Sequence, residues 1–243
     1  MILLGLSPGE TRIYKDKVRK RGRTLMILFL ASLLLFPLVY LLFGAGWVPA
    51  RPRYNRDLEM PVAMVQTAGG IGTAFLYNET ELLTARHVVE DMEVGEEVTL
   101  TFSNADPPIT TTARIVWKDP DTSPPGDINY YLNDVARLEL IQPTDLPEDF
   151  PRLYLGDSDG ITARTPVVLI GYPDGNSSTT TGTISNEEAM GADIFQLDVS
   201  AYPGNSGGPL ITEDTEEVIG ILIAGRTEEF QGINFAIKVN NID

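Results

Sequence analysis

The stretch "YPGNSGGPL", residues 202–210, consists largely of Gly, Pro, Ser and Asn and follows the strand-like run "IFQLDVS". This composition is typical of a turn. The stretch also presents Ser206 between glycines, and a serine hydroxyl becomes a nucleophile when a neighbouring base takes its proton. The rest of the chain therefore decides between a plain turn and a nucleophile loop.

A base and a carboxylate are both available to such a serine. The single histidine, His87, lies in "LLTARHVVE", where an apolar strand runs into a polar corner. Asp134, in "YLNDVARLEL", precedes an alternating strand and is the best candidate for the carboxylate that holds the imidazole in the right tautomer. Asp127 and Asp119 lie in a Pro-rich loop and are weaker candidates. Each residue alone also has a structural interpretation, as a core histidine, a strand-start cap or a turn serine.

Beyond residue 60 the sequence has the pattern of an all-β protein. Short apolar or alternating runs such as "EVTLTF", "TTARIVWK" and "PVVLIGY" recur between turn residues, and they are rich in Val, Ile, Thr and aromatic residues. Long helical periodicity is absent. These features predict a β-sandwich or β-barrel.

The stretches "TARHVV", "NDVARL" and "GNSGGPL" occur in the order His, Asp, Ser. Together with "GGIGTAFLY" and "GINFAIKVNNI", they resemble the trypsin/chymotrypsin-like serine proteases, and most of all the HtrA/Deg branch, over about residues 60–242. The resemblance implies an all-β, chymotrypsin-like fold of two six-stranded antiparallel β-barrels, at about 61–145 and about 151–242. A peptide-binding PDZ domain, which that branch usually carries, is not expected in this chain, so control by such a domain is not carried over.

The resemblance also implies a serine endopeptidase that acts on polypeptide substrates. The catalytic residues would be His87, Asp134 and Ser206. The backbone N–H groups of Gly204 and Ser206 would form an oxyanion hole, in which preorganised donors stabilise the charge on the attacked carbonyl oxygen. This chemistry requires no cofactor and no metal, and a chain with no cysteine and one histidine offers few ligands for zinc.

The substrate preference is predicted from two places. In the fold that the resemblance implies, Ser200, six residues before Ser206, would lie at the bottom of the pocket for the residue that precedes the cut. Ile221 and Ile223 alternate with Leu222 in "GILIAG", where the pocket wall is expected, so the wall should be apolar whichever face of the strand points inward. An uncharged residue at the bottom of the pocket and an apolar pocket wall predict cleavage after small or medium aliphatic residues.

The charge of the chain is divided unevenly. Residues 1–23 hold seven Lys and Arg residues and two acids, whereas residues 51–243 hold 11 basic and 32 acidic residues. So acidic a body repels phosphate backbones, which excludes nucleic acid as a partner. The acidity is compatible with simple solubility and with a salty environment.

The segment at 24–48 contains no charged residue and reads "TLMILFLASLLLFPLVYLLFGAGWV". About 20 apolar residues in a helix cross a ~30 Å hydrocarbon layer, which predicts a transmembrane signal anchor in the lipid bilayer. The basic residues before it place 1–23 in the cytoplasm as a tail. Residues 49–60 would be a tether, and 61–243 a protease domain in the periplasm or at the cell surface. A cleaved signal peptide is the alternative.

Two other classes of function remain as alternatives. The chain could be a catalytically silent relative that binds peptides at the membrane, or a membrane-tethered structural protein in which the three residues coincide by chance. Labelling by a fluorophosphonate probe that disappears in Ser206→Ala distinguishes an enzyme from the first. A structure with His87 and Ser206 far apart would favour the second.

Overall fold

The structure, a computed structural model, describes residues 56–120, 132–223 and 233–242. The described residues belong to one compact unit, Tyr54–Asp243.

The predicted cytoplasmic tail (1–23), the predicted anchor (24–48) and most of the predicted tether (49–60) lie outside the described residues. In the part of the chain that is described, no helix combines the length and the apolar character needed to cross a membrane. The end of the predicted tether forms the short helix α2 (Arg56–Glu59).

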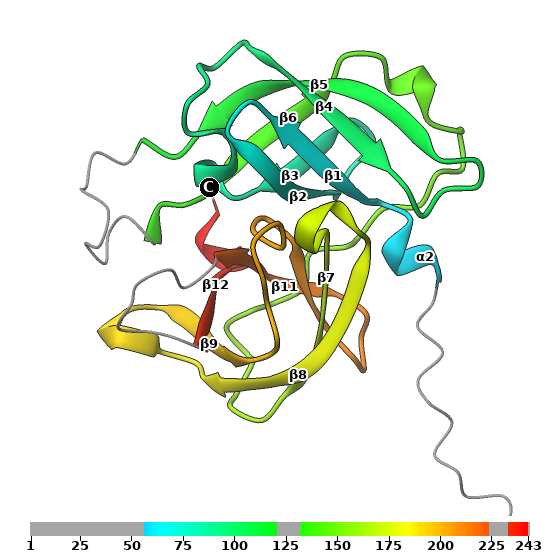
Figure 1. Cartoon of the computed structure of the whole chain (residues 1–243). Coiled ribbons are helices and arrows are strands. Elements are labelled where there is room, and N and C mark those ends of the chain that lie inside the picture. The colour runs from blue at the N-terminus through cyan, green and yellow to red at the C-terminus, as the bar shows by residue number, and fades with distance from the viewer. Residues whose placement is uncertain (1–55, 121–131, 224–232, 243) are drawn as a thin grey trace, which may run out of the picture. The chain divides into compact units, whose positions relative to one another are not determined.

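Six antiparallel strands close the first barrel, in the order β1-β2-β3-β6-β5-β4 (Figure 1). Strand β4 shows why these residues form a barrel wall, because "EVTLTF" buries Val98, Leu100 and Phe102 while Glu97 and Thr99 face solvent. This period of two is that of a strand with one face in a core. The strands are β1 (Val62–Thr67), β2 (Gly70–Leu76), β3 (Glu81–Thr84), β4 (Glu97–Phe102), β5 (Ile109–Lys118) and β6 (Ala136–Leu140).

Six further antiparallel strands close the second barrel, in the order β10-β11-β12-β9-β8-β7. They are β7 (Pro166–Gly171), β8 (Ser178–Asn186), β9 (Ile194–Asp198), β10 (Pro209–Thr212), β11 (Val218–Ile223) and β12 (Asn234–Lys238). Every residue of β11 is buried, so this strand has apolar surroundings on both faces. The prediction of two six-stranded antiparallel barrels is confirmed.

Three apolar clusters account for this burial. One fills the first barrel and another fills the second. The third cluster combines residues of both barrels, such as Phe75 of β2 and Tyr172 after β7, and therefore forms the layer between them. The hydroxyl of Tyr172 donates to the carbonyl of Val62 in the first barrel (3.0 Å) and accepts from Ser103 (3.0 Å). The two barrels are thus packed as one body, and residues from both can be held in a fixed geometry where they meet.

Candidate active site

His87 and Asp134 meet at one edge of the first barrel. His87 lies on the short 3₁₀ helix η2 (Arg86–Val89), which begins two residues after the end of β3. Asp134 lies two residues before β6. The strands β3 and β6 are paired, with Thr84 opposite Ala136, so the end of one strand and the start of the other lie side by side.

Asp134 holds His87 at two points. Its carboxylate accepts a hydrogen bond from the imidazole Nδ1 (2.6 Å) and another from the backbone N–H of His87 (2.8 Å). The backbone carbonyl of Asp134 accepts a third bond from the N–H of Arg86 (3.1 Å). Because a carboxylate can only accept, the proton of the neutral imidazole lies on Nδ1, and Nε2 keeps its lone pair. Asp134 is 1% exposed, so this geometry is protected from water.

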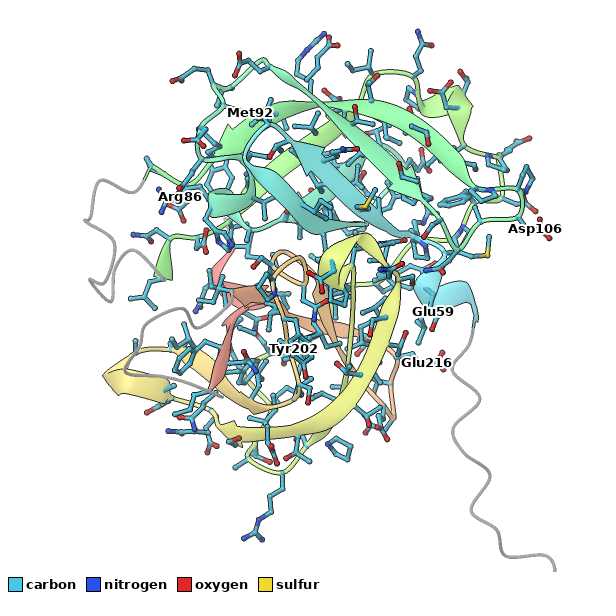
Figure 2. All side chains as sticks on the ribbon, viewed as in Figure 1. Glu59, Arg86, Met92, Asp106, Tyr202 and Glu216 are labelled. Carbon is cyan, nitrogen blue, oxygen red and sulfur yellow. The ribbon has the colours of Figure 1, made fainter. Side chains whose placement is uncertain are left out.

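The surroundings make His87 a stronger base than a free histidine. Burial lowers its pKa, but the hydrogen bond and the negative charge of Asp134 outweigh burial and raise the pKa above its ordinary value. The charge of Glu90 also raises it, and the charge of Arg86 lowers it. Figure 2 shows Arg86 at the edge of the first barrel, near the junction with the second barrel.

Ser206 lies on the loop between β9 and β10 of the second barrel. The loop is closed by hydrogen bonds of its own backbone. The N–H of Asn205 donates to the carbonyl of Tyr202 (3.0 Å), and the N–H of Gly208 donates to the carbonyl of Asn205 (2.9 Å). Tyr202 itself, labelled over the second barrel in Figure 2, is 60% exposed. Ser206 is 6% exposed. The serine is therefore presented by an ordered turn.

Two backbone donors of this loop have no acceptor among the residues that the structure describes. The N–H of Asn205 donates to the carbonyl of Tyr202, and the N–H of Gly207 donates to the carbonyl of Leu222 (2.8 Å). No hydrogen bond among the described residues uses the N–H of Gly204 or the N–H of Ser206 as donor. Buried backbone donors are rarely left unpaired, so these two N–H groups are available to an oxygen atom of a bound molecule.

The Ser206 loop packs directly against the chain that leads to His87. Gly207 has a φ of 85°, and a Cβ on it would overlap the carbonyl oxygen of Thr73 and lie 2.8 Å from the N of Ala85, two residues before His87. Only glycine permits this approach. Within the described residues no hydrogen bond joins the Ser206 hydroxyl to His87. Such bonds are often long before substrate binds.

The predicted pocket residues do not share one surface. Ser200 is exposed. Ile221 and Ile223 are buried in the cluster between the barrels, whereas Leu222 is buried inside the second barrel, because successive residues of a strand face opposite ways. Either the two isoleucines or Leu222 can belong to a pocket wall, but not all three. In the ranges that the structure describes, no group of three or more His, Asp and Glu side chains is placed to hold a metal ion.

Buried polar residues beside the loop were not singled out from the sequence. Thr73 of β2 and Thr84 of β3 are fully buried, and Thr73 bonds to the Ser206 loop. The available signal was a threonine inside the apolar run "GTAFL", at a position where a barrel strand faces a core.

Comparison with known proteins places this geometry in a family. The trypsin-like peptidase domain matches residues 72–221. A relative named "Probable periplasmic serine endoprotease DegP-like" from Pseudomonas fulva (strain 12-X) is 32% identical over 184 residues, which is 71% of this chain and 33% of the relative. A protein of the same name from Halomonas elongata is 32% identical over 179 residues, 70% of this chain and 33% of that protein. The chain spans about a third of the length of the curated relatives it matches.

Solved structures share the fold. The crystal structure of Rv3671c from M. tuberculosis H37Rv, an inactive mutant form, matches with a TM-score of 0.60 at 22% identity and covers 80% of this chain and 89% of that one. The HtrA-type protease AlgW with a tripeptide matches with a TM-score of 0.58 at 27% identity and covers 76% and 60%. Because the matched domain takes in more than half of the sequence, the chain belongs to the trypsin-like peptidase family.

Proposed function

We propose that the protein is a serine endopeptidase in which Ser206 is the nucleophile, His87 the general base and Asp134 the carboxylate that orients the base. The observation that carries the proposal is the two-point contact of Asp134 with His87, at 2.6 Å and 2.8 Å, which leaves the imidazole Nε2 free to accept a proton. Family membership and the packing of the Ser206 loop beside Ala85 support it.

The chemistry has two halves. His87 Nε2 takes the proton of the Ser206 hydroxyl as Oγ attacks the carbonyl carbon of the scissile peptide, and the ionised Asp134 stabilises the imidazolium. The imidazolium then gives this proton to the leaving amine, the C–N bond breaks, and an ester remains on Ser206. In the second half, His87 takes a proton from water as the water attacks the ester, and returns it to Ser206 Oγ.

The unpaired N–H groups of Gly204 and Ser206 form the proposed oxyanion hole. Negative charge develops on the carbonyl oxygen in both attacks, and each well-placed donor contributes ~3 kcal/mol to the transition state. The N–H of Asn205, which lies between them in the sequence, is occupied by its bond to the carbonyl of Tyr202. The loop thus presents two donors from alternate residues.

For the substrate we infer small or medium aliphatic residues before the cut. The support is the neutral side chain of Ser200 and the absence of charge on Ile221, Leu222 and Ile223, of which one face can contribute. A peptide library digested by the full-length protein should show Ala, Val, Ile or Leu before the cut. A profile dominated by Arg, Lys or Glu would contradict this preference without affecting the proposed mechanism.

The protease domain is proposed to act outside the cytoplasm, anchored by residues 24–48. The uncharged sequence of this segment and the periplasmic relatives support this location. Carbonate extraction of membranes should leave the full-length protein in the pellet, and mass spectrometry should find residues 1–23 still attached. A soluble chain cut near "FGAGW" would support the cleaved signal peptide instead.

The mechanism is tested with the full-length protein and a fluorophosphonate probe, which reacts only with an activated serine. Wild type should be labelled and should hydrolyse peptides, and Ser206→Ala should lose labelling and on the order of 10⁶-fold in kcat. Ser177→Ala, which removes an exposed hydroxyl bonded to Asn104, is the matched control and should be labelled normally. An unlabelled wild type would favour the catalytically silent, peptide-binding alternative.

A further inference from the structure

Thr73 makes an unusual set of contacts where the two barrels meet. It lies on β2, a strand on the side of the first barrel that faces the second (Figure 1), and it is fully buried. Its hydroxyl donates to the carbonyl of Gly204 (2.7 Å) and accepts from the N–H of Tyr172 (3.1 Å). Its backbone N–H donates to the carbonyl of Ser206 (2.8 Å), and its carbonyl accepts from the hydroxyl of Thr84 (2.7 Å).

The two loop carbonyls that Thr73 holds belong to Gly204 and Ser206. These are the same two residues whose N–H groups are unpaired within the described chain. Thr73 of the first barrel therefore holds the backbone carbonyls of both residues whose N–H groups are the proposed oxyanion donors.

The bond to Gly204 matters most, because glycine does not fix its own backbone. Gly204 has a φ of 102°, and glycine reaches many other conformations at little cost. The peptide on its N-terminal side is held through Pro203, whose carbonyl accepts from the N–H of Asp174 (3.3 Å). In a trans peptide the C=O and N–H point in opposite directions, so this bond turns the Gly204 N–H away from Asp174. The Thr73 hydroxyl fixes the peptide on the other side.

We propose that Thr73 is a positioning residue of the oxyanion hole, whose hydroxyl holds Gly204 in the conformation that directs its N–H to the attacked carbonyl oxygen. This inference rests on the proposed function. The hydroxyl must donate and accept at once, because it lies between the carbonyl of Gly204 and the N–H of Tyr172. Serine can make both bonds, whereas valine, which has the shape of threonine, can make neither.

The test compares full-length wild type with Thr73→Val and Thr73→Ser. It measures kcat, KM, the melting temperature and the affinity of a peptidyl boronate with an aliphatic residue at the boron. The boronate forms a tetrahedral adduct with serine whose oxygen occupies the oxyanion hole, so its affinity reports on the donors. Thr73→Val should lose on the order of 10²-fold in kcat and a similar factor in boronate affinity. KM should stay close to wild type, because the lost interaction acts in the transition state. Thr73→Ser should recover most of both losses.

A matched control separates this effect from lost stability. Thr111→Val also removes a buried hydroxyl of the first barrel, one that donates to Asp145 (2.6 Å), away from the loop. It should lower the melting temperature and leave kcat and boronate affinity unchanged. If Thr73→Val behaves like Thr111→Val, the inference is wrong.

If Thr73→Val does not fold, Thr73→Ala and Thr73→Ser decide the matter, because they differ by the hydroxyl alone. Equal kcat and equal boronate affinity in these two would overturn the inference, and a large loss in Thr73→Ala alone would support it. A failure of the proposed function looks different, since wild type itself would then neither hydrolyse peptides nor react with the fluorophosphonate.

Discussion

The two halves of the proposed site are held in different ways. His87 is fixed within the first barrel, because its ring and its backbone N–H both donate to the carboxylate of Asp134 and the N–H of the preceding Arg86 donates to the carbonyl of Asp134. The Ser206 loop belongs to the second barrel, but Thr73 of the first barrel holds two of its carbonyls. The base half of the site, His87 with Asp134, therefore depends on the first barrel alone. The nucleophile half, the loop that carries Ser206, depends on how the two barrels pack.

The base half should fail most severely when its carboxylate is changed. In Asp134→Asn the side-chain amide places a donor where the Nδ1 proton needs an acceptor, so the imidazole takes the wrong tautomer. In this type of triad the change costs roughly 10⁴-fold in kcat. Steady-state hydrolysis of a peptide substrate measures the loss.

The matched control for Asp134 is Asp119→Asn, because Asp119 is a weaker candidate for the same role. It also lies nearby, since its N–H donates to the carbonyl of Val135, the residue after Asp134 (2.9 Å). It should keep activity near that of wild type. An equal loss in the two variants would mean that the carboxylate of the triad has been wrongly assigned.

The nucleophile half should be most sensitive at Gly204. In Gly204→Ala the new Cβ would overlap the carbonyl oxygen of Tyr172, and the φ of 102° is strained for alanine. The loop must move, so the N–H of Gly204 is displaced, and kcat should fall by ~10²–10³-fold. Peptide hydrolysis and thermal unfolding together measure the effect.

Gly95→Ala separates strain from displacement. Gly95 has the same φ of 102°, but a Cβ there would meet nothing within 4 Å. This variant should lose on the order of 1–3 kcal/mol of stability from strain and should keep the kcat of wild type. If both glycine variants lose stability and activity alike, the close approach of Tyr172 to Gly204 does not position the loop.

The same contrast explains how much the sequence could predict. The strands can be predicted from alternation, and Asp134 can be chosen because it stands just before an alternating strand. That this strand pairs with the one before His87 is seen only in the structure. The contact between Thr73 and Gly204 joins residues 131 positions apart, in different barrels, and no local pattern encodes it. The pocket wall was equally hidden, because β11 is buried on both faces and its alternation does not tell which face would meet a substrate.

The smallest predicted effect concerns pH and again tests the base half. Burial lowers the pKa of His87, and Asp134 raises it further than burial lowers it. The base works only when neutral, so kcat/KM should rise with pH and reach its half-maximum above pH 6.5, the ordinary value for histidine. In Asp134→Asn the raising influence of Asp134 is gone, and the residual activity should reach its half-maximum at lower pH. A half-maximum that does not move between the two proteins would contradict the role given to Asp134.

The raised pKa of His87 also makes the stability of the folded protein depend on pH. The folded protein binds the His87 proton more tightly than the unfolded chain, so the protonated pair contributes stability that is fully present below the unfolded pKa. This contribution is lost as pH rises through the folded pKa. The free energy of unfolding of wild type, measured relative to His87→Gln, should therefore be largest at acidic pH and should decline as His87 deprotonates. Urea titrations across this range measure the difference. A wild-type advantage that grows with pH would show that the contact between His87 and Asp134 does not favour the protonated ring.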